Sequence, residues 1–246
     1  MILIVGSTKD DTLYFDSVMT GKRKETLFGR YELTFGNIFN QEVILLSNVY
    51  TSYISSVCVS HLLEKYFIIL VFVVGKATAY TPDLNIGDII LSRRVFVSDV
   101  DLIEETNSKL GQIPGFPSVY ESPIDVIQYA NAAFESRTMI PHKTGTIISS
   151  NTSYSNDAQI KPFNVENQLF GHNRCVAFDT ITGGVAIACN LFNVPFISTK
   201  VISRKFGNRQ SAKDYSNVLK NYAAVGKGIV NTIGDIGRND VLRGGE

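Results

Sequence analysis

Three basic side chains follow one apolar segment late in the chain. In FISTKVISRKFGNRQS (196–211), Arg204, Lys205 and Arg209 come after a run that is typical of a buried strand, and no carboxylate appears before Asp214. In α/β proteins, ligands commonly bind where strands reach their carboxyl ends. Guanidinium and ammonium groups at such a place attract a phosphate, a carboxylate or a nucleotide.

Lys76 and Lys200 could join this set, because the basic residues follow different strands of one predicted sheet. The alternative is that these side chains are solvated, with Arg204 in solvent or paired with Asp214. Phosphorolysis would need a dedicated phosphate site, and Gly6-Ser7-Thr8, followed by two aspartates, is a poor anion cradle. The sequence therefore leaves open an anion site but argues against a phosphorylase.

Carboxylates occur at two predicted strand–helix junctions. Asp10 and Asp11 follow the first apolar run, and Asp179 precedes a later helical segment. A carboxylate at such a place can orient a water molecule for hydrolysis. It can equally cap the next helix, which we expect to start near Thr12 in the first case. Both interpretations stand for Asp11, and capping is the preferred role for Asp179.

The composition excludes several classes of protein. Lys plus Arg and Asp plus Glu balance at 23 each, so a general affinity for nucleic acid is not expected. Three cysteines in apolar surroundings and three scattered histidines indicate buried thiols in a reducing compartment, with no metal site and no cofactor. The longest apolar run, 66–75, is about half a bilayer span. We expect a cytoplasmic protein without a membrane segment.

Periodicity predicts strands alternating with helices. The predicted strands lie within 1–6, 30–48 (with a turn at Asn40–Gln41), 67–75, 81–99, 143–151 and 194–203, and the predicted helices within 51–66, 122–137, 179–193 and 212–233. Residues 103–122 are interpreted as a long excursion. The pattern predicts one α/β domain over 1–233, with a mostly parallel sheet covered on both faces, and a flexible tail over 234–246.

Five blocks follow one another at compatible spacings over nearly the whole chain. They are NIGDIILS (85–92), SDVDL (98–102), LGQIPGFP (110–117), GTIISSN (145–151) and LFNVPFISTKVIS (191–203). Together they resemble the bacterial 5'-methylthioadenosine/S-adenosylhomocysteine nucleosidases of the nucleoside phosphorylase superfamily. The resemblance implies a single-domain three-layer α/β/α fold with a central mixed sheet. It also implies a homodimer, in which 110–117 with Tyr120 reaches the partner subunit and the helix from Thr51 adds contacts.

The resemblance implies a role in nucleoside metabolism and methionine salvage, and a specific chemistry. Hydrolysis of the bond between adenine and ribose passes through an oxocarbenium-like state, so water must be oriented and the base must gain a proton. The family's water-handling glutamate falls on Asp11, its ribose-binding glutamate on Ile181 and its base-protonating aspartate on Arg204. An isoleucine side chain cannot form hydrogen bonds with the ribose diol. An arginine stays protonated near neutral pH and cannot act as a general acid.

The remaining ligand-binding residues are also implied by the resemblance. GKATA stands for the family's G-S-A-G-G segment, FDTIT for the segment with the ribose glutamate, and Tyr154 for the aromatic residue that stacks on the base, one place out of register. The implied set is Gly75, Lys76, Tyr154, Phe178, Asp179, Thr180, Ile181 and Ser203.

These residues leave three hypotheses open. The first is a divergent nucleosidase homologue with lost or altered N-ribosyl hydrolase activity, which binds a nucleoside or an anionic ligand. The second is an active hydrolase for a different base, with Asp11 orienting water and Arg204 reading the base, as an arginine does for uracil in related pyrimidine nucleoside phosphorylases. The third is a dimeric scaffold without catalysis.

Overall fold

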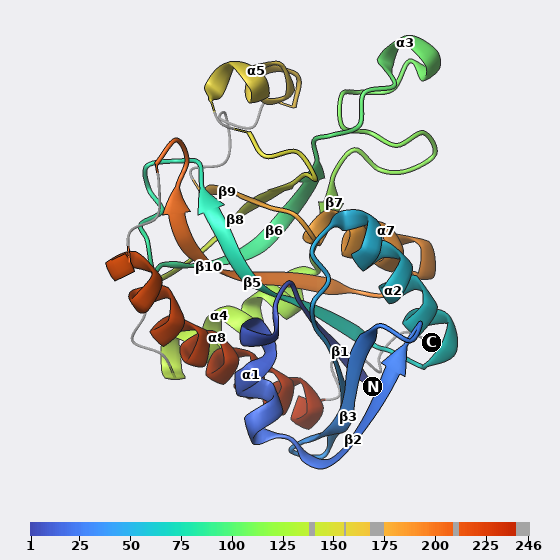
Figure 1. Cartoon of the computed structure of the whole chain (residues 1–246), viewed down its shortest axis with the longest axis vertical. Coiled ribbons are helices and arrows are strands. Elements are labelled where there is room, and N and C mark those ends of the chain that lie inside the picture. The colour runs from blue at the N-terminus through green and yellow to red at the C-terminus, as the bar shows by residue number, and fades with distance from the viewer. Residues whose placement is uncertain (138–140, 155, 168–174, 209–211, 240–246) are drawn as a thin grey trace.

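One mixed sheet forms the centre of the protein, with helices on both of its faces (Figure 1). The computed structural model describes residues 1–137, 141–154, 156–167, 175–208 and 212–239. The strands are β1 (Ile2–Gly6), β2 (Thr20–Leu27), β3 (Tyr31–Ile38), β4 (Gln41–Leu46), β5 (Leu70–Ala79), β6 (Ile89–Val97), β7 (Tyr120–Glu121), β8 (His142–Ser149), β9 (Val176–Asp179) and β10 (Phe196–Lys205). The helices are α1 (Lys9–Val18), α2 (Ser52–Lys65), α3 (Ile103–Thr106), α4 (Ile124–Arg137), α5 (Asp157–Glu166), α7 (Thr182–Phe192) and α8 (Ala212–Asn239). The α/β fold with a mixed sheet, implied by the resemblance, is confirmed.

The sheet closes on itself at one end. Strand β1 lies between β4 and β5 and is parallel to both, while β3 and β2 extend this side in antiparallel fashion. On the other side, β10 pairs in parallel with β5 and antiparallel with β6. Strand β6 continues to β8, β8 to β9, and β9 returns to β5. These five strands form a closed ring, which brings segments distant in sequence to one place.

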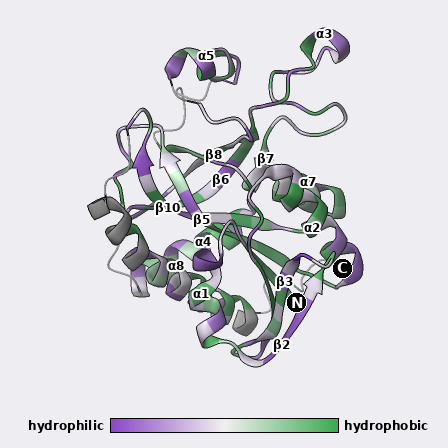
Figure 2. Cartoon of the chain, in the orientation of Figure 1, coloured by the Kyte–Doolittle hydropathy of each residue, from purple (hydrophilic) through white to green (hydrophobic). Residues whose placement is uncertain are grey.

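Alternate residues of the central strands face opposite helical layers. Ile2 and Ile4 pack in the core under α1, α4 and α8, whereas Leu3 and Val5 pack in the core under α2 and α7. Side chains alternate in this way because a strand has a period of two. Since both faces are covered, the strands are apolar on both sides, and Figure 2 shows the central strands as mainly hydrophobic.

A glycine allows the two helices of one layer to come close. A Cβ atom at Gly184 in α7 would lie 2.0 Å from the carbonyl oxygen of Ser52 in α2. The Gly183–Gly184 pair lowers helix propensity, but Gly184 allows α2 to pack closely against the start of α7. The hydroxyl of Ser52 there donates to the carbonyl of Thr180, and the hydroxyl of Ser55 donates to that of Ile181.

Several elements were absent from the sequence-based prediction. Strand β2 has one buried side chain, Leu27, so it has no apolar pattern to reveal it. Strand β9 and helix α5 were also missed, and the excursion of 103–122 contains the short α3 and β7. In Figure 1, α3 and α5 lie beyond one end of the sheet, and Phe163 of α5 packs against Phe96 of β6.

The predicted boundary of the flexible tail was wrong. Helix α8 continues to Asn239 instead of ending at 233, and Ile236 in this extension is buried. A Cβ atom at Gly234 would meet the ring of Phe39 at 3.0 Å, so the helix packs against the turn between β3 and β4 at this point. Residues 240–246 lie outside the described residues.

Candidate functional site

A cavity of about 340 Å³ lies where β5, β8, β9 and β10 reach their carboxyl-terminal ends. Its lining consists of Lys76, Ala77, Thr78, Ser150, Asn151, Thr152, Ser153, Tyr154, Phe178, Asp179, Thr180, Ser203, Arg204 and Phe206. The structure therefore brings together seven of the ten residues assigned to a site from the sequence. The other three, Asp11, Gly75 and Ile181, are not part of this lining. The binding roles of all ten stay predictions.

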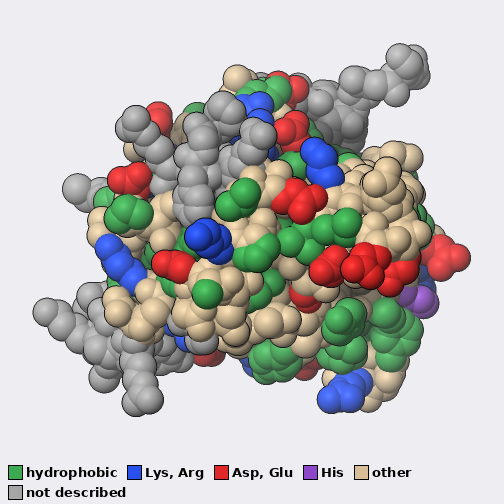
Figure 3. Space-filling model, turned by 90° about the horizontal axis from the view of Figure 1, so that it is seen from above, with side chains coloured by type: hydrophobic (Ala, Val, Ile, Leu, Met, Phe, Trp, Pro, Cys, Tyr) green, Lys and Arg blue, Asp and Glu red, His purple; other side chains and the backbone are tan. Residues whose placement is uncertain are grey.

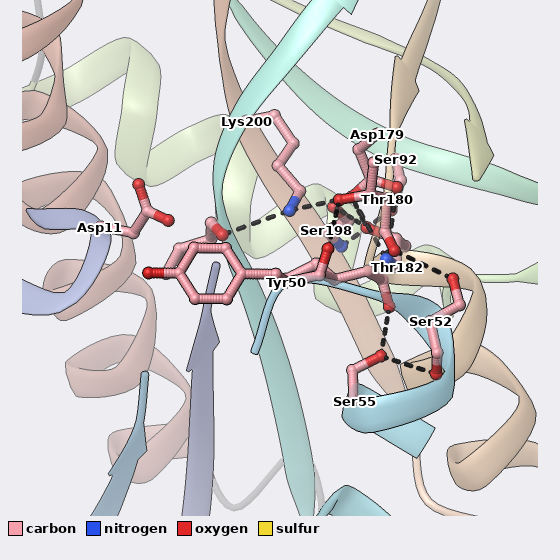
Figure 4. Close-up of polar contacts among 12 residues, drawn as sticks. Asp11, Tyr50, Ser52, Ser55, Ser92, Asp179, Thr180, Thr182, Ser198 and Lys200 are labelled. Atoms are coloured by element: carbon pink, nitrogen blue, oxygen red, sulfur yellow. Dashed lines mark hydrogen bonds and ion pairs between the residues drawn. The ribbon is translucent and has the colours of Figure 1, made fainter. Parts of the chain in front are cut away.

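Asp179 and Lys200 form a buried ion pair at the wall of the cavity. The Lys200 Nζ lies 3.0 Å from Asp179 Oδ2, and the two side chains are 0% and 2% exposed. Lys200 Nζ also donates to the carbonyl oxygen of Val74 at 3.2 Å. Figure 4 shows the ammonium group between this carbonyl and the Asp179 carboxylate. The possibility that Lys200 joins a basic set at the mouth is therefore not supported, because its charge is balanced inside the wall.

Helix α7 holds the other side of the Asp179 carboxylate. Its Oδ1 and Oδ2 accept from the Thr182 backbone N–H at 3.3 and 3.2 Å, and Oδ2 also accepts from the Thr182 hydroxyl. Asp179 thus caps the start of α7, as preferred from the sequence. The same Thr182 hydroxyl lies 3.1 Å from Ser198 Oγ.

Buried hydroxyls continue this network away from the cavity. The Ser198 backbone N–H donates to Ser92 Oγ at 2.8 Å, and Ser92 Oγ lies 3.2 Å from Ser122 Oγ. A buried polar network of this kind fixes geometry only when its members are satisfied, and each of these links has a partner. Asp179 is therefore rigidly positioned and its charge is compensated.

The Asp11 carboxylate caps the start of helix α1. Its Oδ2 accepts from the Thr8 backbone N–H at 2.7 Å, and α1 starts at Lys9 instead of near Thr12. Asp11 is 4% exposed, and its Oδ1 is buried with no hydrogen-bond partner among the described residues. A Cβ atom at Gly75 would lie 2.9 Å from Asp11 Oδ2, and Gly75 has a φ of +134°. Glycine at this position lets β5 pass directly beside the carboxylate.

Ile181 belongs to the hydrophobic core. Its side chain is fully buried in the cluster formed with α2 and α7, and it does not line the cavity. The placement of a ligand-binding residue at Ile181 therefore receives no geometric support. Its carbonyl, not its side chain, makes the polar contact, by accepting from Ser55.

Arg204 lies at the exposed edge of the cavity. Its Nε donates to Thr78 Oγ1 at 2.8 Å, which fixes the plane of the guanidinium group. Within the described ranges it forms no ion pair. The side chain of Asp214, its predicted alternative partner, lies outside the described part of the chain.

Lys205, the next basic residue along the chain, is turned away from the cavity. Lys205 Nζ donates to Asn85 Oδ1 at 3.1 Å and Lys205 does not line the cavity. Arg209 lies outside the described residues. Of the five basic residues that could have converged, Lys76 and Arg204 line the cavity.

Aromatic rings form one wall. The centroid of Phe178 lies 5.7 Å from that of Tyr154 and 5.5 Å from that of Phe206. Tyr80 packs against both Phe178 and Phe206 with centroid distances of 5.0 Å. The Tyr154 hydroxyl lies 3.0 Å from Ser98 Oγ, which holds the ring in place. A planar ring bound here would find an apolar, pre-positioned surface.

Phe206, Tyr80 and the Lys200–Asp179 pair were not identified from the sequence as parts of one site. Phe206 lies two residues after Arg204, so the alternation of a strand could have placed both on one side. Burial, and then the nearby Asp157, raises the pKa of the Tyr80 phenol. Tyr80 supports the aromatic wall and is not part of the cavity lining.

The described residues contain no group of three His, Cys, Asp or Glu side chains placed to hold a metal ion. Among the described helices, none has the length and apolar character needed to cross a membrane.

Comparisons with known proteins agree with this fold. A family profile described as the phosphorylase superfamily matches residues 2–233. The 5'-methylthioadenosine/S-adenosylhomocysteine nucleosidase of Marinomonas sp. (strain MWYL1) is 26% identical over 220 residues, which cover 89% of this chain and 92% of the relative. The corresponding protein of Bacillus subtilis is 26% identical over 202 residues, covering 82% and 84%.

Solved structures show the same architecture. The nucleosidase of Neisseria meningitidis in complex with methylthio-immucillin-A superposes with a TM-score of 0.83 at 16% identity, covering 95% of this chain and 98% of that chain. Futalosine hydrolase of Helicobacter pylori superposes with a TM-score of 0.82 at 19% identity, covering 95% and 97%. The chain belongs to the phosphorylase superfamily, and within it the chain resembles the methylthioadenosine/S-adenosylhomocysteine nucleosidases.

Proposed function

We propose that this protein binds a nucleoside-like ligand in the cavity at Arg204 and hydrolyses methylthioadenosine far more slowly than its nucleosidase relatives. One observation carries the proposal. Among the described residues that line the cavity, Asp179 is the one carboxylate, and its charge is compensated by Lys200 at 3.0 Å.

Cleavage of the bond to adenine needs a proton for the departing base. Asp179 pairs with a lysine and accepts hydrogen bonds from Thr182, so it is poorly suited to donate one. Arg204 occupies the position of the family's acid and keeps its proton near neutral pH. Loss of a general acid typically lowers the rate by about 10²–10⁴-fold. Loss of the ribose-binding glutamate at Ile181 removes further binding of the transition state.

The test is adenine release from methylthioadenosine and from S-adenosylhomocysteine by the purified protein. Arg204→Asp should raise this rate, because it restores a carboxylate at the edge of the cavity. Lys205→Asp is the matched control, since this adjacent residue contacts Asn85 and not the cavity. Ile181→Glu is left out of the test, because a carboxylate at this fully buried position would destabilise the core. Wild-type turnover at ordinary enzyme rates would overturn the proposal.

A second candidate is hydrolysis of a nucleoside with a different base. It is favoured by Asp11, whose Oδ1 is buried and has no partner in the described part of the structure. A carboxylate in that state can hold a water molecule, while Arg204 stabilises a base that leaves as an anion. Release of the free base from uridine or inosine should then be measurable. Asp11→Asn should abolish it, because asparagine still accepts from the Thr8 N–H but cannot act as a base. The absence of hydrolysis of both nucleosides would exclude this candidate.

We also propose that the protein forms a homodimer through α2. Tyr50, Tyr53, Ile54 and Val57 are apolar and exposed at the beginning of this helix, and Tyr53 is 70% exposed. A cluster of aromatic and aliphatic side chains is typical of an interface core. Light scattering after size exclusion should show a dimer that Val57→Glu converts to a monomer. Phe67→Glu, at an exposed apolar residue beyond the helix, should leave the dimer intact. A monomeric wild type would contradict this.

A further inference from the structure

The charges that line the cavity do not cancel. Asp179, the acidic member, is neutralised by Lys200 within the wall. Lys76 and Arg204 are the basic members of the described lining, and the other lining residues are neutral. Arg204 forms no ion pair among the described residues, so its guanidinium group gives the cavity a positive charge that can bind one anionic group.

Arg204 is positioned to receive an acid. Its Nε is fixed by Thr78 Oγ1 at 2.8 Å, and the structure records no carboxylate within ion-pair distance of it among the described residues. An arginine whose plane is held in this way loses little entropy when its remaining N–H groups form a two-fold contact with a carboxylate or phosphate.

The carboxylates near the cavity are otherwise engaged. Asp99 accepts from the backbone N–H of Asn151 at 2.7 Å and from its side-chain amide at 2.9 Å. Asp157 interacts with the Tyr80 hydroxyl. Neither belongs to the lining. A ligand acid at Arg204 would thus not compete with a protein carboxylate of the described residues.

The surroundings favour an aromatic acid over a bare ion. Phe178 and Phe206 line the same cavity as Arg204 and offer a face for a planar ring. On the face shown in Figure 3, both basic and acidic side chains are present among hydrophobic ones.

We propose that the ligand of this site is an acidic nucleoside. Its base lies against Phe178 and Phe206, and its phosphate or carboxylate binds Arg204. The inference rests on the proposed nucleoside site and adds that the ligand is negatively charged. This charge distinguishes the ligand from methylthioadenosine, which is uncharged.

The experiment compares neutral nucleosides with their acids on the full chain. Uridine is compared with UMP, in which the sugar carries a phosphate, and with orotidine, in which the base carries a carboxylate. Adenosine and AMP form a purine pair, and inorganic phosphate is the control without a ring. Affinities are measured by calorimetry, and thermal shift serves as an independent readout, because a ligand of the folded state raises the melting temperature.

We expect at least one acid to bind roughly tenfold to hundredfold tighter than its neutral parent, the range for a charge-assisted contact. Arg204→Gln should remove most of this difference, whereas Lys205→Gln should preserve it, since Lys205 is turned to Asn85. UMP and orotidine separate the two possible sources of the acid. Equal affinities for neutral and acidic forms, or equal effects of the two variants, would overturn the inference and leave the nucleoside site standing. If inorganic phosphate alone stabilised the protein as much as the acidic nucleosides do, the ring would have no part in the inferred binding. If no nucleoside and no acid binds, the proposed function falls as well.

Discussion

Replacing Lys200 with methionine removes one half of a fully buried ion pair. Methionine fills a similar volume, so the main effect is electrostatic: the Asp179 carboxylate stays in the wall at 2% exposure without its ammonium partner. The carbonyl of Val74 loses its donor at the same time.

The expected cost is large. Breaking a buried pair by removing one partner typically costs about 3–5 kcal/mol. For a chain of 246 residues, each kcal/mol shifts the melting temperature by about 2–4 °C, which gives a loss of roughly 6–20 °C. Removing both charges should cost less, because no uncompensated ion remains. Asp179→Asn keeps an oxygen that can accept from Thr182, so the double variant Asp179→Asn/Lys200→Met preserves the cap of α7.

The assay is equilibrium unfolding in urea for the wild type, both single variants and the double variant. This cycle isolates the coupling between the two side chains. We expect the double variant to be more stable than Lys200→Met alone. If Lys200→Met lost less than about 1 kcal/mol, or if the two changes were simply additive, Asp179 would not depend on Lys200 and would be available to a ligand.

Two further predictions concern the interior. Gly75→Ala should destabilise the protein by about 1–3 kcal/mol, because its φ is +134° and the new Cβ would lie 2.9 Å from Asp11 Oδ2. Gly29→Ala is the control: this glycine also has a positive φ but lies in open space, so the substitution should cost less. Equal urea midpoints for the two variants would contradict the role of crowding at Gly75. Burial raises the pKa of the Cys58 thiol from its ordinary 9.0 to about 11. The folded protein thus holds this proton to higher pH than the unfolded chain. The contribution of the protonated Cys58 thiol to the free energy of unfolding is therefore complete below pH 9 and is lost as pH rises towards 11. Urea midpoints across this range should decline less steeply for Cys58→Ala than for the wild type, and identical slopes would show that the thiol does not contribute.

The parts of the fold that sequence patterns predicted are those with a local signal. Strands β1 and β5 are nearly continuous apolar runs, because helices cover both faces of the sheet. The helix α4 begins after Pro123 as expected from its proline, and α7 begins next to Asp179. Strand β2 carries exposed side chains along most of its length, so its existence depends on pairing with β3, which periodicity does not report.

The site was predicted less completely, because its decisive contacts join distant residues. Lys200 is a single charge in an apolar strand, and the balance of this charge within the wall becomes visible only when β9 places Asp179 beside it. The resemblance assigned a ligand-binding position to Ile181, yet its side chain packs in the core under α2. The aromatic wall combines Tyr154, Phe178 and Phe206 from three segments that meet because the ring of strands closes. Alignment placed residues near the cavity but could not give the direction of a side chain.

The most direct measurement is the rate of adenine release from methylthioadenosine by the wild-type protein. The Bacillus subtilis nucleosidase, 26% identical in sequence, serves as the parallel reference. Because we propose that Arg204 replaces the acid, and because Asp179 is bound to Lys200, we expect kcat/KM to be at least about 10²-fold below the reference. A value comparable to the reference would show that another group delivers the proton and that the cavity is a working adenine-nucleosidase site.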